Sequence, residues 1–186
     1  MTNFNIKNFS KELLIIVLSA LVIFLVIQTF LVGRAIVVGS SMEPNLHTDQ
    51  RILVNKVAYA FAEPERGDVI VFTPPFTSDS DLIKRVIGLP GETVEIVEGV
   101  VYIHQTDGSI IRLEEDYIKG PLTDSYTSGK IPADSYFVMG DNRNNSRDSR
   151  EGWFVKRSSI HGRAWFSIWP LSDWGAIISY DYATAY

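Results

Sequence analysis

A single run of apolar residues constrains this chain more than any other feature of its sequence. From residue 13 to residue 32, the letters LLIIVLSALVIFLVIQTFLV contain no charged side chain. An α-helix rises about 1.5 Å per residue, so this run would be about 30 Å long, which is the thickness of the hydrocarbon core of a bilayer. We therefore predict a single transmembrane helix at residues 13–32. The alternatives are a cleaved signal peptide and a buried helix, but a secretory apolar region is usually shorter and no clear small-x-small cleavage site follows the run.

The apolar run divides the chain into three parts. We predict a short N-terminal segment at residues 1–12, the anchor at 13–32 and one β-rich domain at 33–186. The N-terminal segment is too short to fold alone, so the activity belongs to the last part. The flanking charges do not decide the orientation in the membrane, because two lysines before the run are matched by two arginines after it.

The composition excludes several classes of function. The chain has a net charge of -5 at pH 7, whereas a surface that binds nucleic acid must be basic, so we expect no nucleic-acid partner. The sequence has no cysteine, which rules out disulfides, thiolate metal sites and a cysteine nucleophile. The three histidines, His47, His104 and His161, have no metal-ligand spacing, and we expect neither a metal nor a cofactor.

After Gly33, the sequence is typical of an antiparallel β domain. Short runs of β-branched and aromatic residues are separated by turn sequences such as GLPGE and TDGS. We predict a mainly β fold with strands at residues 34–38, 51–55, 68–73, 82–87, 93–98, 100–105, 110–113, 136–140 and 163–169. The stretch from Glu115 to Ser135 is rich in Asp, Ser, Thr, Gly and Pro, and we predict a long surface excursion there.

Two adjacent serines, Ser40 and Ser41, follow the apolar run in the stretch VVGSSMEPNL. A serine attacks a carbonyl only if a base accepts its proton, and histidine is the usual base. His47 lies in NLHTDQ, which is typical of an exposed loop. The other base available to a serine is a neutral lysine, which must be buried so that its pKa falls by about 2 units or more.

Lys84 is the candidate for such a lysine, because it lies within the apolar strand sequence LIKRVI. Side chains alternate between the two faces of a strand, so Lys84 and Arg85 are expected on opposite faces, with one of them on the more buried face. A strand lysine is more often solvated, which is the alternative reading of Lys84.

A third stretch, MGDNRNNSRDSREGW, has almost no apolar side chain. An EF-hand calcium loop beginning at Asp141 would need glycine at its sixth position and glutamate at its twelfth, but Ser146 and Gly152 stand there. The short hydrogen-bonding side chains instead favour a loop that supports a site, in which Asp148 and Arg150 pair. A plain solvated loop is the alternative.

Together these stretches closely resemble the sequence boxes of type I signal peptidases, the membrane-bound serine proteases that remove signal peptides from exported proteins. The matching stretches are GSSMEPNL, ERGDVIVF, IKRVIGLPGETV and YFVMGDNRNNSRDSR, which occur in the family's order between Gly39 and Arg150. The resemblance implies an antiparallel β-sheet catalytic domain of the signal-peptidase type. It also implies that Ser41, directly before the methionine, is the nucleophile and that Lys84 is the general base.

The resemblance assigns roles to further residues. In the family, a serine of the GDN box hydrogen-bonds the lysine, which corresponds to Ser146, and residues corresponding to Asp148 and Arg150 support the site. The oxyanion would be held by the backbone N–H of Ser41 and by a second donor. That second donor stays open, because Gly39 stands where one branch of the family has a serine.

The resemblance also implies a substrate and a location. The family prefers small residues, often alanine, at the first and third positions before the cut, in a substrate that binds as an added strand. Apolar pockets are then expected from six residues: Val37, Val38, Met42, Leu46, Leu82 and Ile83. The implied partners are secretory preproteins with an Ala-x-Ala junction and the lipid bilayer. The chain would be a single-pass protein of the cell membrane, with its N-terminus in the cytoplasm and its catalytic domain outside.

The aromatic stretch AWFSIWPLSDW near the C-terminus has two readings. Family members have an apolar surface that meets the bilayer, to which four residues would contribute: Trp165, Phe166, Trp169 and Trp174. Aromatic residues in such a run are otherwise core residues.

Two other functions stay open from the sequence alone. Self-cleaving repressor proteins resemble this family in fold and share its serine–lysine pair, but they are soluble and carry a DNA-binding region. A membrane-anchored β module that only binds is the second alternative. An inactive relative of that kind would be expected to have lost Ser41 or Lys84, and both are present.

Overall fold

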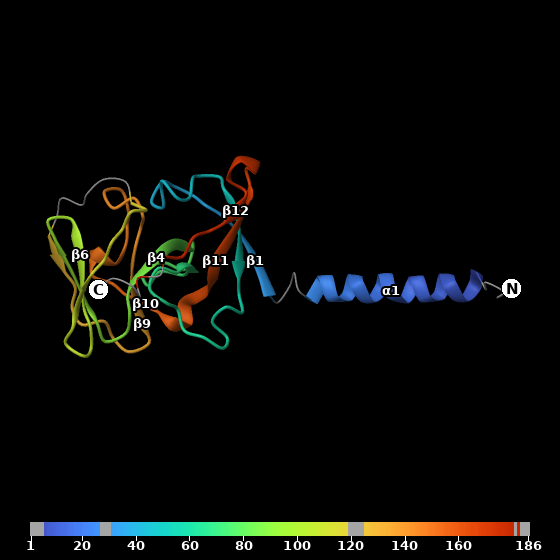
Figure 1. Ribbon diagram of the computed structural model, residues 1–186, viewed down its shortest axis with the longest axis horizontal. Coiled ribbons are helices and arrows are strands. Elements are labelled where there is room, and N and C mark those ends of the chain that lie inside the picture. Colours follow the sequence, from blue (N-terminus) through green and yellow to red (C-terminus); the bar gives the residue numbers. More distant parts are fainter. Residues whose placement is uncertain (1–5, 27–30, 119–124, 181, 183–186) are drawn as a thin grey trace.

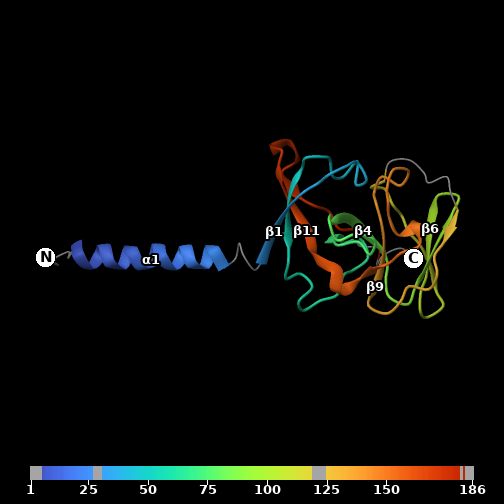
Figure 2. The ribbon, with the colours of Figure 1, turned by 180° about the vertical axis from the view of Figure 1, so that it is seen from behind.

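The structure of the chain is a computed structural model that describes residues 6–26, 31–118, 125–180 and 182. A single helix projects from a β body that contains two antiparallel sheets (Figures 1 and 2). The smaller sheet lies at the end of the body that is farther from the helix (Figure 1). This architecture confirms the mainly β fold predicted from the sequence.

Helix α1 spans Ile6–Val26. Its large apolar side chains between Leu13 and Leu25 are half or more exposed, because the helix points away from the β body (Figure 2). Within the part of the chain that the structure describes, no helix is both long enough and apolar enough to cross a membrane. The transmembrane helix predicted at residues 13–32 is not found among the described residues, and residues 27–30 of that run lie outside them.

The end of the predicted membrane segment also needs correction. Residues 27–30 lie outside the described residues, and Val32 begins strand β1 (Val32–Ile36) instead of ending a helix. Val32 pairs with Asn55 and Gly33 with Val54, so the neighbouring strand satisfies the extended backbone at this point. An apolar composition alone does not distinguish a buried strand from a helix, which explains the difference.

The larger sheet has the strand order β1-β2-β11-β3-β4-β9-β10, and β12 pairs with β11. Its other strands are β2 (Arg51–Asn55), β3 (Val69–Phe72), β4 (Leu82–Gly88), β9 (Ser135–Met139), β10 (Val155–Lys156), β11 (Ile160–Trp169) and β12 (Gly175–Ala176). In this order β4 lies between β3 and β9, with Ile70 opposite Lys84 and Met139 opposite Arg85. The strand that carries the candidate base is thus an inner strand of the sheet.

The smaller sheet has the order β7-β6-β5-β8. Its strands are β5 (Thr93–Val97), β6 (Val100–His104), β7 (Ile110–Arg112) and β8 (Tyr126–Thr127). Burial alternates along β5 and β6, so that one face of each strand packs into a core shared with β9. Three 3₁₀ helices are also described: η2 (Ser149–Glu151), η3 (Arg157–Ser159) and η4 (Leu171–Asp173).

All nine predicted strands are present, with ends within three residues of their predicted positions. The strands that the sequence did not predict are β8, β10 and β12, which have two residues each. Such short strands carry too few side chains to show an alternating pattern. Strand β8 lies within the predicted surface excursion, of which residues 119–124 lie outside the described part.

Both faces of β4 are covered, which corrects one expectation. The sequence predicted that one residue of the Lys84–Arg85 pair would be the more buried, but the two are 2% and 1% exposed. Val86 packs into a core cluster with Phe72, while Ile87 packs into a different cluster with Tyr117. An inner strand between two clusters buries both of its alternating sets of side chains.

Candidate active site

The two candidate catalytic side chains are in direct contact. Lys84, in the middle of β4, donates a hydrogen bond from Nζ to Ser41 Oγ at 2.7 Å and another to the carbonyl oxygen of Ile83 at 2.9 Å. Ser41 is half-buried. The adjacent Ser40 faces elsewhere, since its Oγ accepts a hydrogen bond from Asn145 Nδ2 at 2.8 Å. The contact therefore selects Ser41 over Ser40.

The surroundings of Lys84 favour its neutral form. Burial penalises the charged ammonium and lowers the pKa of Lys84 to about 8. The carboxylates of Asp148 and Asp141 oppose this shift, because negative charges favour the protonated lysine. Burial prevails, and an appreciable fraction of Lys84 is a free amine near neutral pH.

The loop that carries Ser41 is attached to the polar loop after β9. The backbone N–H of Asn142 donates to the carbonyl oxygen of Ser41 at 3.0 Å, and Asn142 Nδ2 donates to that of Ser40 at 3.0 Å. The two loops approach so closely at Gly140 that a Cβ there would overlap both the Ser41 carbonyl oxygen and the Ser146 hydroxyl. Only glycine fits between them, and this close approach sets the position of Ser41 relative to β4.

Asp148 and Arg150 form the pair predicted from the sequence. Arg150 donates from Nε and Nη2 to the two carboxylate oxygens of Asp148, at 2.8 and 2.9 Å. The fully buried Asp148 also accepts the backbone N–H of Gly140 at 3.1 Å, and Arg150 Nη2 donates to the carbonyl oxygen of Arg143 at 2.7 Å. The pair thus shapes the loop that contacts Ser41.

Ser146 is placed differently from its expected role. Its hydroxyl is buried and has no hydrogen-bond partner among the described residues, so the expected bond to Lys84 is not formed in this structure. Lys84 Nζ bonds to Ser41 and Ile83 instead. A buried hydroxyl without a partner costs about 1–3 kcal/mol, so an interaction that forms later, when the Ser41 proton moves, would recover that cost.

We expect Ser146→Ala to lower kcat by about tenfold while leaving the midpoint of thermal unfolding unchanged or slightly raised. The substitution removes an unpartnered polar group from a buried place, so stability has little to lose. Parallel measurements of kcat and thermal unfolding check this. A loss of several kcal/mol in stability would instead show that the hydroxyl already has a structural partner.

Several residues that the sequence did not single out complete the site. Arg85 forms a bidentate ion pair with Asp141, at 2.9 Å from Nε and 2.7 Å from Nη2, and both side chains are at most 1% exposed. Asn45 Nδ2 donates to the same carboxylate at 2.9 Å. Arg143 pairs with Glu115 in the same buried region. For the Arg85–Asp141 pair, the only signal in the sequence was an arginine within an apolar strand and an acidic residue in the GDN stretch.

The residues expected to line apolar substrate pockets do not share one surface. Three are buried in a single core cluster: Val37, Met42 and Leu46. Ile83 packs against that cluster, Leu82 packs against another, and both are half-buried. Val38 is 83% exposed. The last three are therefore the ones that a substrate can touch without a rearrangement of the core.

None of the three histidines forms a hydrogen bond to Ser41 or Lys84 in the described part of the chain. His47 is exposed, as expected, while His104 pairs with Glu95 and His161 with Asp81. Across the residues that the structure describes, no group of His, Asp or Glu side chains is arranged to hold a metal ion. The contact with Ser41 is made by the lysine.

A serine hydroxyl in contact with a buried lysine amine, on an antiparallel β scaffold, is the arrangement expected in serine hydrolases that use lysine in place of histidine. Comparisons with known proteins narrow the class. The model of the signal peptidase family, peptidase S26, matches residues 10–169. The chain belongs to this signal peptidase family, and it is a serine endopeptidase.

Individual relatives agree with the family match. A probable signal peptidase I-1 of a Synechocystis species is 39% identical over 184 residues, which cover 95% of this chain and 91% of that protein. Signal peptidase I of Leptolyngbya laminosa is 41% identical over 166 residues, which cover 85% of this chain and 79% of that protein. The crystal structure of a signal peptidase I from Enterococcus faecalis is 36% identical, covers 54% of this chain and 96% of that chain, and gives a TM-score of 0.46.

Proposed function

We propose that this chain removes N-terminal signal peptides from exported preproteins, with Ser41 as the nucleophile and Lys84 as the general base. The observation that carries the proposal is the 2.7 Å hydrogen bond between Lys84 Nζ and Ser41 Oγ, made by a lysine that is 2% exposed. A hydroxyl and its base at hydrogen-bond distance meet the first geometric requirement of nucleophilic catalysis. Membership of the signal peptidase family indicates the substrate class.

The reaction would proceed in two steps. In the first, neutral Lys84 takes the proton of the Ser41 hydroxyl as Oγ bonds to the carbonyl carbon of the last residue of the signal peptide. The amide bond breaks, the leaving amine takes a proton from the Lys84 ammonium, and an acyl-enzyme remains. In the second step, Lys84 takes a proton from water as the hydroxide attacks the ester, and Lys84 returns the proton to Ser41 Oγ when the ester bond breaks. A base with a pKa of about 8 is suited to both directions of proton transfer near neutral pH.

The substrate would bind as an extended strand with small residues, as in Ala-x-Ala, before the cut. A strand substrate gains main-chain hydrogen bonds, and shallow apolar pockets beside the nucleophile select side chains by size. Half-buried Leu82 and Ile83 at the start of β4, together with exposed Val38, are available to line such pockets. The Ser41 backbone N–H would hold the oxyanion together with a second donor.

The chain would work at a membrane surface, anchored by the apolar run that begins at Leu13, with its N-terminus in the cytoplasm and its catalytic domain outside. Contiguous exposed apolar side chains such as those of α1 favour an apolar environment over water. Trp165, Trp169 and Trp174 are 43%, 51% and 59% exposed, and tryptophan is enriched at membrane interfaces. Strands β1, β11 and β12 lie at the end of the body from which α1 projects (Figure 1), and Trp165 and Trp169 belong to β11.

We expect cleavage to require Ser41 and to rise with pH through about 8. Lys84 acts only as a free amine, and with a pKa of about 8 the neutral fraction is about 1% at pH 6 and about 90% at pH 9, so kcat/KM should rise between 50- and 100-fold across this range. The measurement is the cleavage of a preprotein with an Ala-x-Ala junction by the detergent-solubilised full chain from pH 6 to 10. Ser41→Ala should abolish cleavage at every pH.

Ser40→Ala is the matched control, because it removes the neighbouring hydroxyl, which bonds to Asn145 and not to Lys84. It should keep most of the activity and the same pH profile. Cleavage that survives Ser41→Ala, or a profile that is flat from pH 6 to 9, would defeat the proposed mechanism.

A further inference from the structure

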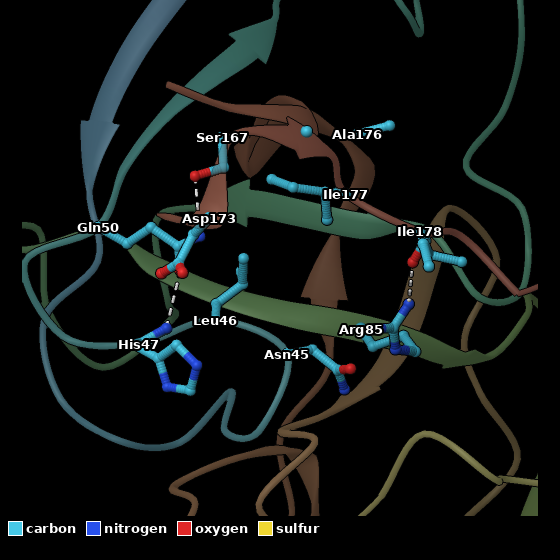
Figure 3. Close-up of a pocket in the computed structure, with 11 residues that line it drawn as sticks. Asn45, Leu46, His47, Gln50, Arg85, Ser167, Asp173, Ala176, Ile177 and Ile178 are labelled. Atoms are coloured by element: carbon cyan, nitrogen blue, oxygen red, sulfur yellow. Dashed lines mark hydrogen bonds between the residues drawn. The ribbon is translucent and has the colours of Figure 1, made fainter. Parts of the chain in front are cut away.

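The segment after β12 folds back onto the face of β4 opposite to Lys84. We refer to residues 175–180 and Tyr182 as the C-terminal segment. It starts in β12, paired with β11, and continues with a hydrogen bond from the Ile177 N–H to the carbonyl oxygen of Trp165 at 2.9 Å. Its next residue, Ile178, accepts a hydrogen bond from Arg85 Nη1 at 2.9 Å (Figure 3). The C-terminal segment therefore contacts Arg85, the residue directly after the candidate base Lys84.

Arg85 joins the C-terminal segment to the start of β3. Besides the Ile178 carbonyl, Arg85 Nη1 donates to the carbonyl oxygen of Gly67 at 2.8 Å. Gly67 has a φ of 93°, and a Cβ at this position would overlap the carbonyl oxygen of Tyr180. The backbone of the C-terminal segment thus packs directly on Gly67, at a contact that only glycine permits.

Two tyrosines of the segment contact Tyr117, and one of them, Tyr180, also lies beside Arg85. Tyr180 stacks on Tyr117 with ring centroids 4.3 Å apart, and the Arg85 guanidinium lies 4.5 Å from the Tyr117 centroid and 5.0 Å from that of Tyr180. Tyr182 donates its hydroxyl to that of Tyr117 at 2.5 Å, and Tyr117 donates to Glu115 at 2.7 Å. A guanidinium beside aromatic rings gains a cation–π attraction, which is larger in a buried place such as this one.

Arg85 in turn fixes groups that hold the nucleophile. Its carboxylate partner Asp141 is followed by Asn142, whose N–H donates to the carbonyl oxygen of Ser41. Asp141 also accepts a hydrogen bond from Asn45, four residues after Ser41. A continuous set of contacts therefore runs from the C-terminal segment through Arg85 and Asp141 to the backbone of the Ser41 loop.

A cavity lies between part of the C-terminal segment and the Ser41 loop. A space of about 240 Å³ separates Asn45 and Leu46 on one side from Ile177 and Ile178 on the other, with Arg85 at one end (Figure 3). Beside the cavity, Ile177 packs against the apolar cluster that contains Met42 and Leu46, so the segment also contacts the Ser41 loop there. The polar contacts between the segment and the loop run through Arg85 and through Tyr117, whose ring stacks on Tyr180 and whose carbonyl oxygen accepts a hydrogen bond from Asn45 at 3.0 Å.

We propose that the C-terminal segment is a positioning element of the active site. In this role, Tyr180 holds the Arg85–Asp141 pair in place and thereby fixes the position of Lys84 Nζ relative to Ser41 Oγ. The proposal rests on the function proposed above. Without the Tyr180 ring, water reaches Arg85, and β4 and the Ser41 loop lose their fixed separation. A nucleophile and base displaced by about 1 Å lose roughly 100-fold in rate, so the loss should appear in kcat.

The test compares Tyr180→Ala with Tyr180→Phe in the full-length chain. Tyr180→Ala should lower kcat at least tenfold with KM within twofold of the wild type, while Tyr180→Phe, which keeps the ring, should restore kcat. The pKa of Lys84, read from the titration of its ¹³Cε NMR signal, should rise above its value of about 8 in Tyr180→Ala, because added water stabilises the charged amine. Tyr102→Ala, which truncates a half-buried tyrosine in the smaller sheet, is the matched control.

The readouts separate this inference from the proposed function. If the wild type cleaves the preprotein and Tyr180→Ala leaves both kcat and the Lys84 pKa unchanged, the inference is overturned and the proposed function stands. If the wild type does not cleave, the proposed function fails, and the NMR titration still decides the structural link: an unchanged Lys84 pKa overturns it and a raised one supports it. Loss of kcat with Tyr102→Ala to the same extent would reveal a general loss of stability and would overturn the specific role of Tyr180.

Discussion

Lys84→Met should abolish cleavage and at the same time make the protein more stable at neutral pH. Methionine matches the length and apolar stem of lysine but cannot accept a proton, so we expect kcat/KM to fall by at least about 10³-fold, the range seen when a general base is lost. The burial of Lys84 between two strands leaves room for an unbranched apolar side chain. Activity and stability should therefore change in opposite directions.

The gain in stability follows from the lowered pKa of Lys84. The folded chain binds the Lys84 proton with a pKa of about 8, whereas the unfolded chain binds it with the ordinary value of 10.5. Below pH 8, Lys84 is protonated in both states, and the whole free energy that corresponds to the difference between the two pKa values favours the unfolded state. This destabilisation disappears as the pH rises from 8 to 10.5. Removing the amine should therefore raise the free energy of unfolding at pH 7 by about 1–3 kcal/mol, and by much less at pH 10.5.

Chemical denaturation at pH 7 and pH 10.5, together with the preprotein assay, measures both effects. Lys156→Met serves as the control, because Lys156 is exposed on the short edge strand β10 and should show neither effect. A Lys84→Met protein that is inactive and strongly destabilised would mean that the lysine holds the fold, and the assignment of Lys84 as the base would lose its main support.

The sequence predicted the elements of the site better than their connections. Strand β4 and the serine–lysine pair were predictable, because an apolar strand sequence interrupted by a lysine is unusual and the boxes around Ser41 and Lys84 are specific. The structure confirms that the pair is in contact, and it confirms the Asp148–Arg150 pair, whose members are two residues apart. Local spacing was sufficient for the second pair, and family resemblance was needed for the first.

Connections between distant segments could not be predicted. The partner of Arg85 is Asp141, 56 residues away, and the ring of Tyr180 reaches Tyr117 from near the end of the chain. Neither contact leaves a periodic or local pattern in the sequence, because the first depends on how β4 and β9 pair and the second on where the chain packs after β12. The burial of both faces of β4 has the same origin: the sequence shows alternation along one strand, but not what covers each face.

Breaking the Arg85–Asp141 pair should have the largest effect on stability of any single substitution at the site. Both side chains are at most 1% exposed, and removing the guanidinium in Arg85→Met leaves a buried carboxylate with only Asn45 as its remaining side-chain partner among the described residues. Leaving one partner of a buried ion pair alone costs about 3–5 kcal/mol. Because a domain of this size has a total stability of about 5–15 kcal/mol, Arg85→Met is expected to unfold at much lower denaturant concentration.

The double variant Arg85→Met/Asp141→Leu separates the ion pair from the rest of the contact. Replacing both charges removes the unpaired carboxylate, so the double variant should recover at least about 2 kcal/mol relative to the sum of the single variants. The exposed pair Arg147–Glu151, at 2.9 Å on the surface, is the matched control and should give a coupling of about 0.5 kcal/mol or less.

Activity should not recover with stability in the double variant. The introduced methionine and leucine side chains can restore apolar packing, but they cannot donate to the carbonyl oxygens of Gly67 and Ile178 or accept from Asn45, and these bonds fix the C-terminal segment and the Ser41 loop. A folded double variant with low kcat would show that the buried charges are retained for the geometry of the serine–lysine pair. Full activity in that variant, or a coupling energy as small as that of the surface pair, would instead mean that the buried ion pair is dispensable for both fold and catalysis.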